Sequence, residues 1–205
     1  MLSRIQSKST PLTGRSVRAL AVEAWRRAEA MGLAELDATR LEAPDVARLV
    51  QRVRDAGIAR LPALHFDNVE LPTVAEAGAR LKLVIAALEA SPAPRFEWPA
   101  VSRVIDVEQL AALLHVSVSS LKRYASGERD TPDDVAARLH HIALIVGDLA
   151  GAYTEVGVRR WFERKRSVLN GRAPAALLVG DWNPDDASPQ KVRELARSLV
   201  ALGAT

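Results

Sequence analysis

The chain has 205 residues, of which 48% are hydrophobic, 26% are charged and 4% are aromatic. A chain of this length can bury a sizeable core, and its apolar fraction excludes a wholly disordered protein. It contains no cysteine, which excludes disulfides, thiolate metal sites, iron–sulfur clusters and cysteine nucleophiles. The apolar runs, such as residues 142–146, are far too short to span a bilayer. We therefore expect no contact with a membrane and a cytoplasmic location.

The formal net charge of +3 permits nucleic-acid binding without requiring it. Its distribution is uneven: residues 1–22 carry four bases and no acid, and residues 159–172 carry six bases against Glu163 alone. Residues 1–14 lack the apolar core of a secretory signal. We expect them to form a flexible tail, with a basic arm that contacts phosphate or a transit peptide as alternatives.

Most of the chain has the apolar spacing of amphipathic helices. In the first ninety residues this spacing predicts three helices, over residues 16–31, 44–56 and 74–90. Gly32 and Gly57 act as stop signals for the first two. Residues 58–73 are predicted to be a connection with a short extended piece over 64–69. Two prolines within Ser91–Pro94 predict the main boundary of the chain.

Residues 106–124 have the pattern of two short helices joined by a tight turn. Asp106 is placed to cap the first helix, whose buried side consists of Leu110, Ala111, Leu113 and Leu114. Ser117 is placed to cap the second, in which Val118, Leu121 and Tyr124 point inward. His115 stands at the turn position that usually holds glycine, so the turn needs a histidine with a positive φ.

This arrangement is that of a helix-turn-helix, in which the second helix enters the major groove of DNA. Small and basic side chains remain on the outer face of the second helix, as base or phosphate contacts require. The candidate DNA-binding residues are Ser117, Ser119, Ser120, Lys122, Arg123 and Arg129. The alternative is a pair of core helices with a polar outer face.

A long helix is predicted to follow. Thr131 is its expected cap and Pro132 its first residue, with two acids in the first turn. Its apolar positions have a heptad-like spacing, at Val135, Leu139, Ile142, Val146, Leu149 and Tyr153. Ordinary core packing is the main interpretation of this seam, and a homodimer contact is the alternative.

The last fifty residues combine buried anchors with a basic segment. The expected anchors are Trp161, Phe162, Val168 and Leu169, followed by a tight turn at Asn170–Gly171 and a helix start at Pro174. A closing amphipathic helix is predicted from Ser188 onward. The interpretation that assigns no binding role to this region is a small helical subdomain with a solvated basic face.

The order of these elements along the chain resembles that of a known protein family. A repressor-like helix-turn-helix is followed by the pattern Trp-x7-Leu-Asn-Gly-Arg-x-Pro-x-x-Leu-Leu over residues 161–178, then by a loop and an amphipathic helix. Residues 95–205 thereby resemble the antitoxins of the Xre/MbcA/ParS type. The Ser-Gly-Glu-Arg stretch at 126–129, with Pro132, is similar to the end of that family's helix-turn-helix.

The helical patterns predict an all-α protein, and the resemblance, which does not cover the first ninety residues, divides it into three parts. These are an N-terminal helical module of unknown role (1–94), a helix-turn-helix domain (95–154) and a toxin-binding domain (155–205). The resemblance implies a RES-type, NAD-consuming toxin as partner, operator DNA as a second ligand, and a homodimer or a larger toxin–antitoxin complex. The toxin-binding residues that it suggests are Trp161, Arg164, Asn170, Gly171, Arg172 and Pro174.

Nothing in the sequence has the pattern of a catalytic site. The four histidines lack the spacing of zinc ligands, and there is no glycine-rich phosphate loop. We expect no enzymatic activity, no cofactor and no metal. The competing hypothesis is a stand-alone transcription regulator in which the first ninety residues sense a ligand or form a dimer, and an enzyme of unknown chemistry is a third.

Overall fold

The computed structural model describes residues 15–35, 43–58, 74–150 and 152–203. Within these ranges the fold is all-helical, as predicted, and the one β-type pairing is an isolated bridge between Arg166 and Arg172. None of the described helices has the length and apolar character that would be needed to cross a membrane. The predictions for residues 1–14 and for an extended piece over 64–69 lie outside the described residues.

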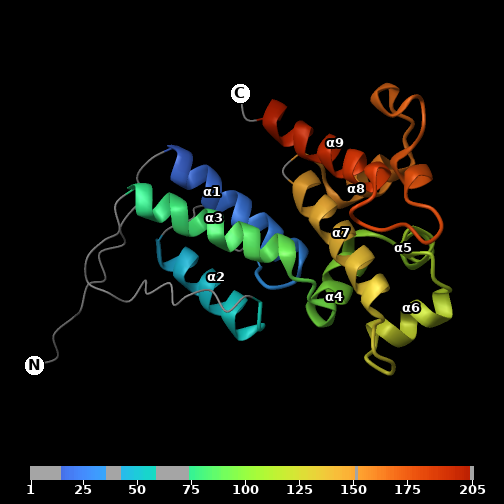
Figure 1. Ribbon diagram of the computed structural model, residues 1–205, viewed down its shortest axis with the longest axis horizontal. Coiled ribbons are helices and arrows are strands. Elements are labelled where there is room, and N and C mark those ends of the chain that lie inside the picture. Colours follow the sequence, from blue (N-terminus) through green and yellow to red (C-terminus); the bar gives the residue numbers. More distant parts are fainter. Residues whose placement is uncertain (1–14, 36–42, 59–73, 151, 204–205) are drawn as a thin grey trace, which may run out of the picture.

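The first three helices form one side of the molecule (Figure 1). They are α1 (Arg15–Ala30), α2 (Ala43–Asp55) and α3 (Val74–Ala90), and α1 packs against both of the others. The predicted stops are confirmed, since Gly32 and Gly57 both have a φ of +74°. This left-handed backbone is the conformation that glycine adopts without steric cost.

The other helices gather around α7. In chain order they are α4 (Pro94–Val104), α5 (Val107–Leu114), α6 (Val118–Ala125), α7 (Asp133–Leu149), α8 (Glu155–Glu163) and α9 (Ala187–Gly203). Two 3₁₀ turns, η1 (Ser167–Leu169) and η2 (Pro174–Leu177), lie between α8 and α9. Helices α1, α4, α5 and α9 all pack on α7, which stands between the α1–α3 side and the α5–α6 side in Figure 1.

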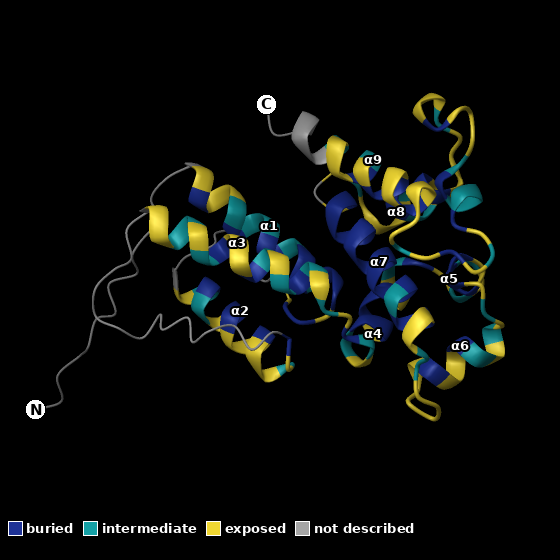
Figure 2. Ribbon diagram, viewed as in Figure 1, coloured by how far each residue is buried: buried dark blue, intermediate teal, exposed yellow. Residues whose placement is uncertain are grey.

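Helix α7 is the most deeply buried element, as its dark colour in Figure 2 shows. Every residue from Arg138 to Leu149 is buried. The heptad-like seam therefore packs inside the chain, and the alternative of a homodimer contact along it is wrong. One continuous hydrophobic cluster joins α7 to helices from all three predicted parts of the chain. It includes Leu49, Leu88, Leu121, Phe162 and Val192. The core is thus continuous across the boundaries expected near residues 94 and 154.

Helix α4 was missed by the sequence analysis. The prolines were interpreted as a break, but Pro94 opens α4 and Pro99 lies within it with its ring exposed. Proline is well tolerated in the first turn of a helix because the first N–H groups there have no intrahelical acceptor. The indole of Trp98 donates a hydrogen bond to Thr131 Oγ1 at 2.9 Å. The prediction that Thr131 caps α7 was wrong, because its hydroxyl holds Trp98 and Pro132 occupies the cap position.

A buried acid–base pair joins α4 to α7. Glu97 is fully buried, and its Oε1 lies 2.6 Å from His140 Nδ1. The other ring nitrogen of His140 lies 3.1 Å from the Glu89 carbonyl oxygen at the end of α3. Both ring nitrogens of His140 thus have a polar partner within hydrogen-bond distance. The pair fixes three helices relative to one another.

An ion-pair network ties α9 to the rest of the fold. Glu89 of α3 lies 2.8 Å from Arg27 of α1 and 3.0 Å from Arg193 of α9, and Arg197 also reaches it. Burial opposes ionisation of Glu89, but the three arginines together outweigh it and lower its pKa. For the more deeply buried Asp148 of α7, burial prevails and raises the pKa. The Glu89 carboxylate, which stays ionised, therefore holds α1, α3 and α9 together, and Asp148 links α7 to the same arginines.

We predict that replacing Gly32 destabilises the protein more than replacing Gly57. A Cβ at Gly32 would lie 2.3 Å from the Phe96 carbonyl oxygen, whereas a Cβ at Gly57 meets nothing within 4 Å. Both have the same positive φ, so Gly57→Ala should cost about 1 kcal/mol from backbone strain alone. Gly32→Ala should cost about 1–3 kcal/mol more, because backbone atoms of α4 must move.

Urea unfolding of the two variants beside the unmodified chain measures both costs. Equal losses of stability in Gly32→Ala and Gly57→Ala would mean that the contact between the end of α1 and α4 is not tight.

Candidate functional site

Helices α5 and α6 have the local geometry that the sequence predicts. Asp106 accepts a hydrogen bond from the Gln109 N–H at 2.9 Å, and Ser117 Oγ accepts one from the Ser120 N–H at 3.0 Å. His115 ends α5 with a φ of 55° and a ψ of 46°, the left-handed conformation expected for it. Both predicted caps and the turn are confirmed, so each short helix is closed by its own neighbouring residues.

The inward and outward faces of α6 also agree with the pattern. Leu121 and Tyr124 are buried, and Val118 is half-buried against the core. On the outer face, Ser119, Lys122 and Arg123 are exposed, as are Ser117 before the helix and Arg129 after it. Ser120 is half-buried and accepts a hydrogen bond from the Ser117 hydroxyl. The candidate DNA-binding residues thus lie together on and beside one helix.

The charge around this helix is less favourable for DNA than its shape. Arg123 pairs with Glu128 at 3.2 Å, and the guanidinium of Arg129 lies 5.6 Å from the centre of the Tyr124 ring. Across residues 106–134, three cations stand against six carboxylates: Asp106, Glu108, Glu128, Asp130, Asp133 and Asp134. Since phosphate contacts supply most non-specific DNA affinity, one copy of this unit offers few of them.

The end of α5 is held by side chains from distant parts of the chain. The last carbonyls of a helix have no intrahelical partner. The indole of Trp182 donates to the Leu113 carbonyl oxygen at 2.9 Å, and Arg138 of α7 donates to that of Leu114 at 3.0 Å. Asp181 lies 3.6 Å from the His115 ring and 3.7 Å from the Arg138 guanidinium. The loop before α9 therefore anchors the α5–α6 turn.

Helix α8 is capped by Thr154 and ends at Glu163. It is followed by a basic loop, residues 164–172, which carries four cations and no acid. The Arg166 N–H donates to the Arg172 carbonyl oxygen at 3.0 Å, and the Gly171 N–H donates to that of Arg166 at 2.9 Å. Asn170 and Gly171 both have positive φ values, so the predicted tight turn is confirmed. The loop projects beyond α8 and α9 (orange in Figure 1).

Four of the six predicted toxin-binding residues lie on this loop with exposed side chains or backbone: Arg164, Asn170, Gly171 and Arg172. The other two, Trp161 and Pro174, are buried, and Trp161 is only 1% exposed. The Trp161 ring packs edge-on against Phe162, and the Arg166 guanidinium lies over it. Trp161 and Pro174 therefore belong to the buried base of the loop and not to its exposed surface.

One expected anchor of this region is wrong. Leu169 is buried as expected, but Val168 is 70% exposed at the end of the loop. The sequence pattern made Val168 and Leu169 equivalent, because both are apolar and adjacent. The 3₁₀ turn η1 directs them differently, and only Leu169 reaches the core.

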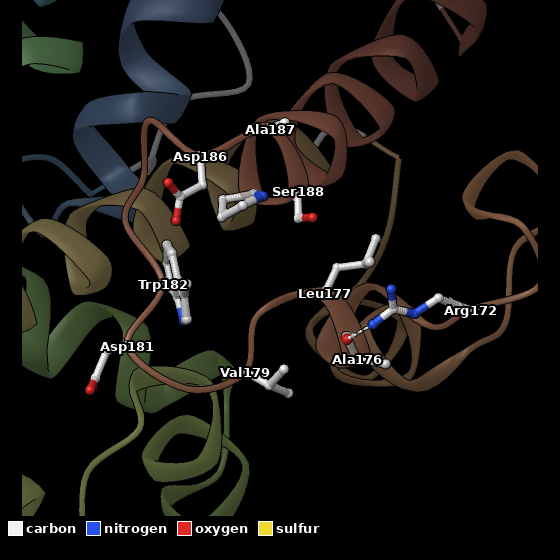
Figure 3. A pocket seen from close by; sticks show the side chains of 10 residues that line it. Arg172, Ala176, Leu177, Val179, Asp181, Trp182, Asp186, Ala187 and Ser188 are labelled. Atoms are coloured by element: carbon white, nitrogen blue, oxygen red, sulfur yellow. Dashed lines mark hydrogen bonds between the residues drawn. The ribbon is translucent and has the colours of Figure 1, made fainter.

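A cavity of about 480 Å³ lies beside the loop, between η2 and the start of α9 (Figure 3). Its lining includes Arg172 and Leu177 on one side and Asp181, Trp182 and Asp186 on the other. Sequence reasoning assigned no binding role to residues 179–189, which it predicted to be a loop and a helix start. Within the described residues, no group of three side chains is placed to bind a metal ion.

Comparison with known proteins adds no identification. No protein-family model, curated protein or solved structure matches the chain.

His141 links α7 to the start of α9 near this cavity. Its Nε2–H donates to the Pro189 carbonyl oxygen at 3.2 Å, and its ring packs edge-on against Trp182. Burial, with the nearby Arg193 acting in the same direction, lowers the pKa of His141 from 6.5 to about 4. The folded protein therefore holds His141 neutral over a pH range in which the unfolded chain binds a proton.

We predict that this difference destabilises the fold in mild acid. Because the unfolded state binds more protons below pH 6.5, stability is full above that value and falls as pH drops toward 4. Between pH 7.5 and pH 5 the loss from His141 alone should be about 2 kcal/mol. Urea unfolding at both pH values should show a smaller loss for His141→Gln than for the unmodified chain.

His115→Asn is the matched control, because His115 is half-exposed and asparagine tolerates its left-handed backbone. An identical pH dependence in His141→Gln and the unmodified chain would contradict the prediction.

Proposed function

We propose that the protein is the antitoxin of a type II toxin–antitoxin pair. In this proposal it neutralises a RES-type, NAD-consuming toxin by direct binding and represses its own operon through a helix-turn-helix formed by α5 and α6. The observation that carries it is the basic loop over residues 164–172. This loop presents the Asn-Gly-Arg part of the antitoxin-like pattern on the surface, while Trp161, Leu169 and Leu178 of the same pattern are buried.

The toxin-binding surface in this proposal is the loop, with Arg164, Asn170, Gly171 and Arg172 as contacts and Trp161 and Pro174 as supports. The backbone hydrogen bonds that Arg166 makes with Arg172 and with Gly171 fix the turn before a partner arrives. A preformed loop loses less conformational entropy on binding than a flexible one. Its cations suit an acidic rim on the toxin, and by resemblance the bound domain would block the toxin's cofactor pocket.

For operator binding, the capped and exposed α6 supports the proposal, with Lys122 and Arg123 as the principal phosphate or guanine contacts. The excess of carboxylates around it predicts that one copy binds DNA weakly. Operator binding should therefore depend on two or more copies, in a homodimer or a larger toxin–antitoxin complex, each placing one α6 in a successive major groove.

A stand-alone transcription regulator is the second candidate. The observation that favours it is the position of α1, which packs directly on α7. Since Arg138 of α7 holds the end of α5, a ligand that moves the α1–α3 module would act on α6 through one helix.

We predict that Arg164→Ala/Arg172→Ala weakens toxin binding by about tenfold or more, because arginines are frequent hot spots of protein interfaces. The measurement is co-purification of tagged protein with the product of the neighbouring gene, followed by titration and by growth rescue in cells that express that product. Arg52→Ala/Arg54→Ala, on the exposed face of α2, removes the same charge and should bind normally. The absence of a partner that is toxic alone would exclude the antitoxin and favour the regulator.

We predict that Lys122→Ala/Arg123→Ala weakens binding to the protein's own promoter DNA. The slope of log K against log salt should also become shallower by about 2, because the loss of two phosphate contacts reduces the number of counterions released on binding. Fluorescence anisotropy at several salt concentrations measures both effects, with Arg52→Ala/Arg54→Ala again as control. If the affinity and the salt dependence are unchanged, α6 is not the recognition helix.

A further inference from the structure

We propose that the cavity between η2 and the start of α9 is a second part of the partner-binding surface, and that it takes a segment of the partner protein carrying a lysine or arginine. This inference rests on the proposed function for the partner's identity as a toxin. The cavity adjoins the basic loop, because Arg172 belongs to both.

The walls of the cavity differ in chemistry. Asp181 and Asp186 stand on one side, at either end of the Trp182 indole (Figure 3). Leu177 and Val179 supply apolar surface, and Val179 is 63% exposed, one of the most exposed large apolar side chains in the described structure. Apolar surface beside carboxylates is what a long cationic side chain needs, since its methylene stem packs while its charged head pairs.

The carboxylates are accessible to such a head group. The Asp181 side chain is 90% exposed, and its Oδ1 lies 3.6 Å from His115 and 3.7 Å from Arg138. Asp186 Oδ2 accepts the Asn183 N–H at 2.8 Å. Each of these contacts uses one oxygen of a carboxylate that has two, so both groups retain capacity to accept from a cation.

The opposite wall suits a peptide backbone. Arg172 donates to the Ala176 carbonyl oxygen, which leaves further N–H groups of its guanidinium for a carbonyl of the partner. The first turn of α9, at Ala187 and Ser188, also lines the cavity, and N–H groups in a first helical turn have no intrahelical acceptor. The volume of about 480 Å³ lies in the range of ligand sites rather than of a single buried ion. An extended segment fits these features better than a free amine.

Occupancy of the cavity should be felt at the α5–α6 turn. Trp182 lines the cavity and also holds the Leu113 carbonyl oxygen, and Asp181 lines it and faces His115. A cation that draws Asp181 away from His115 and Arg138 changes the surroundings of the turn residue His115 and of the guanidinium that binds the Leu114 carbonyl oxygen. The same residues thus connect partner binding to the helix proposed to bind DNA.

The test uses the full chain and two blocked peptides, acetyl-Leu-Lys-Leu-amide and acetyl-Leu-Glu-Leu-amide. Nuclear magnetic resonance follows the indole N–H signals of the four tryptophans and the backbone N–H signals of Leu113, Leu114 and His115. Trp182→Phe assigns the Trp182 indole signal by removing it. The lysine peptide should shift the signals of Trp182 and of the α5–α6 turn in a saturable way, with a Kd of about 1 mM, and the glutamate peptide should not.

Asp181→Asn/Asp186→Asn should reduce the shift produced by the lysine peptide at least fivefold. Asp130→Asn/Asp133→Asn, which removes two exposed carboxylates beside α7, should leave it unchanged. Equal shifts with both peptides, no shift at Trp182, or an equal shift with n-butylamine would overturn the proposal.

The outcome is separable from that of the proposed function, since no toxin is present in this experiment. Peptide binding without any toxic partner would leave the cavity as a protein-binding site and remove only the antitoxin. Toxin binding without a peptide effect at Trp182 would remove only the cavity.

Discussion

The fold depends on the burial of α7 along nearly its whole length. A helix that is apolar on all sides must be covered on all sides, and α1, α4, α5 and α9 cover it. Four buried polar residues on α7 direct these neighbours: Arg138 binds the end of α5, His140 pairs with Glu97 of α4, His141 binds the start of α9, and Asp148 faces the arginines of α1 and α9. Hydrophobic burial brings the helices together, and these directional contacts determine where each one lies.

The same arrangement places the two proposed binding surfaces in contact with one anchor. Trp182 comes from the loop before α9, yet its indole satisfies a carbonyl at the end of α5. Trp182 also lines the cavity beside the basic loop, and the end of α5 that it holds leads into α6. A partner on one surface and DNA on the other would therefore act through a few shared hydrogen bonds rather than through the whole core.

The N-terminal helices join this core without an assigned ligand. Their contribution is visible in the ion-pair network, where Arg27 of α1 and Glu89 of α3 meet Arg193 and Arg197 of α9. This arrangement makes α1 and α3 part of the same cooperative structure as α9. The alternative in which they sense a ligand gains a physical route from it, since the network ends on α7 and α9.

The sequence by itself determined the features that depend on neighbouring residues. The caps at Asp106 and Ser117, the left-handed turn at His115, the stops at Gly32 and Gly57 and the turn at Asn170–Gly171 all follow from local backbone chemistry, and all are confirmed. Tertiary structure alone decided which apolar residues are covered and which polar groups meet. It left Val168 exposed while Leu169 is buried, paired the Thr131 hydroxyl with the Trp98 indole, and brought Asp181, Trp182 and Asp186 around one cavity. The reason is that a short-range pattern records the propensity of each segment, whereas a partner for a buried indole or guanidinium is chosen by packing between residues far apart in the chain.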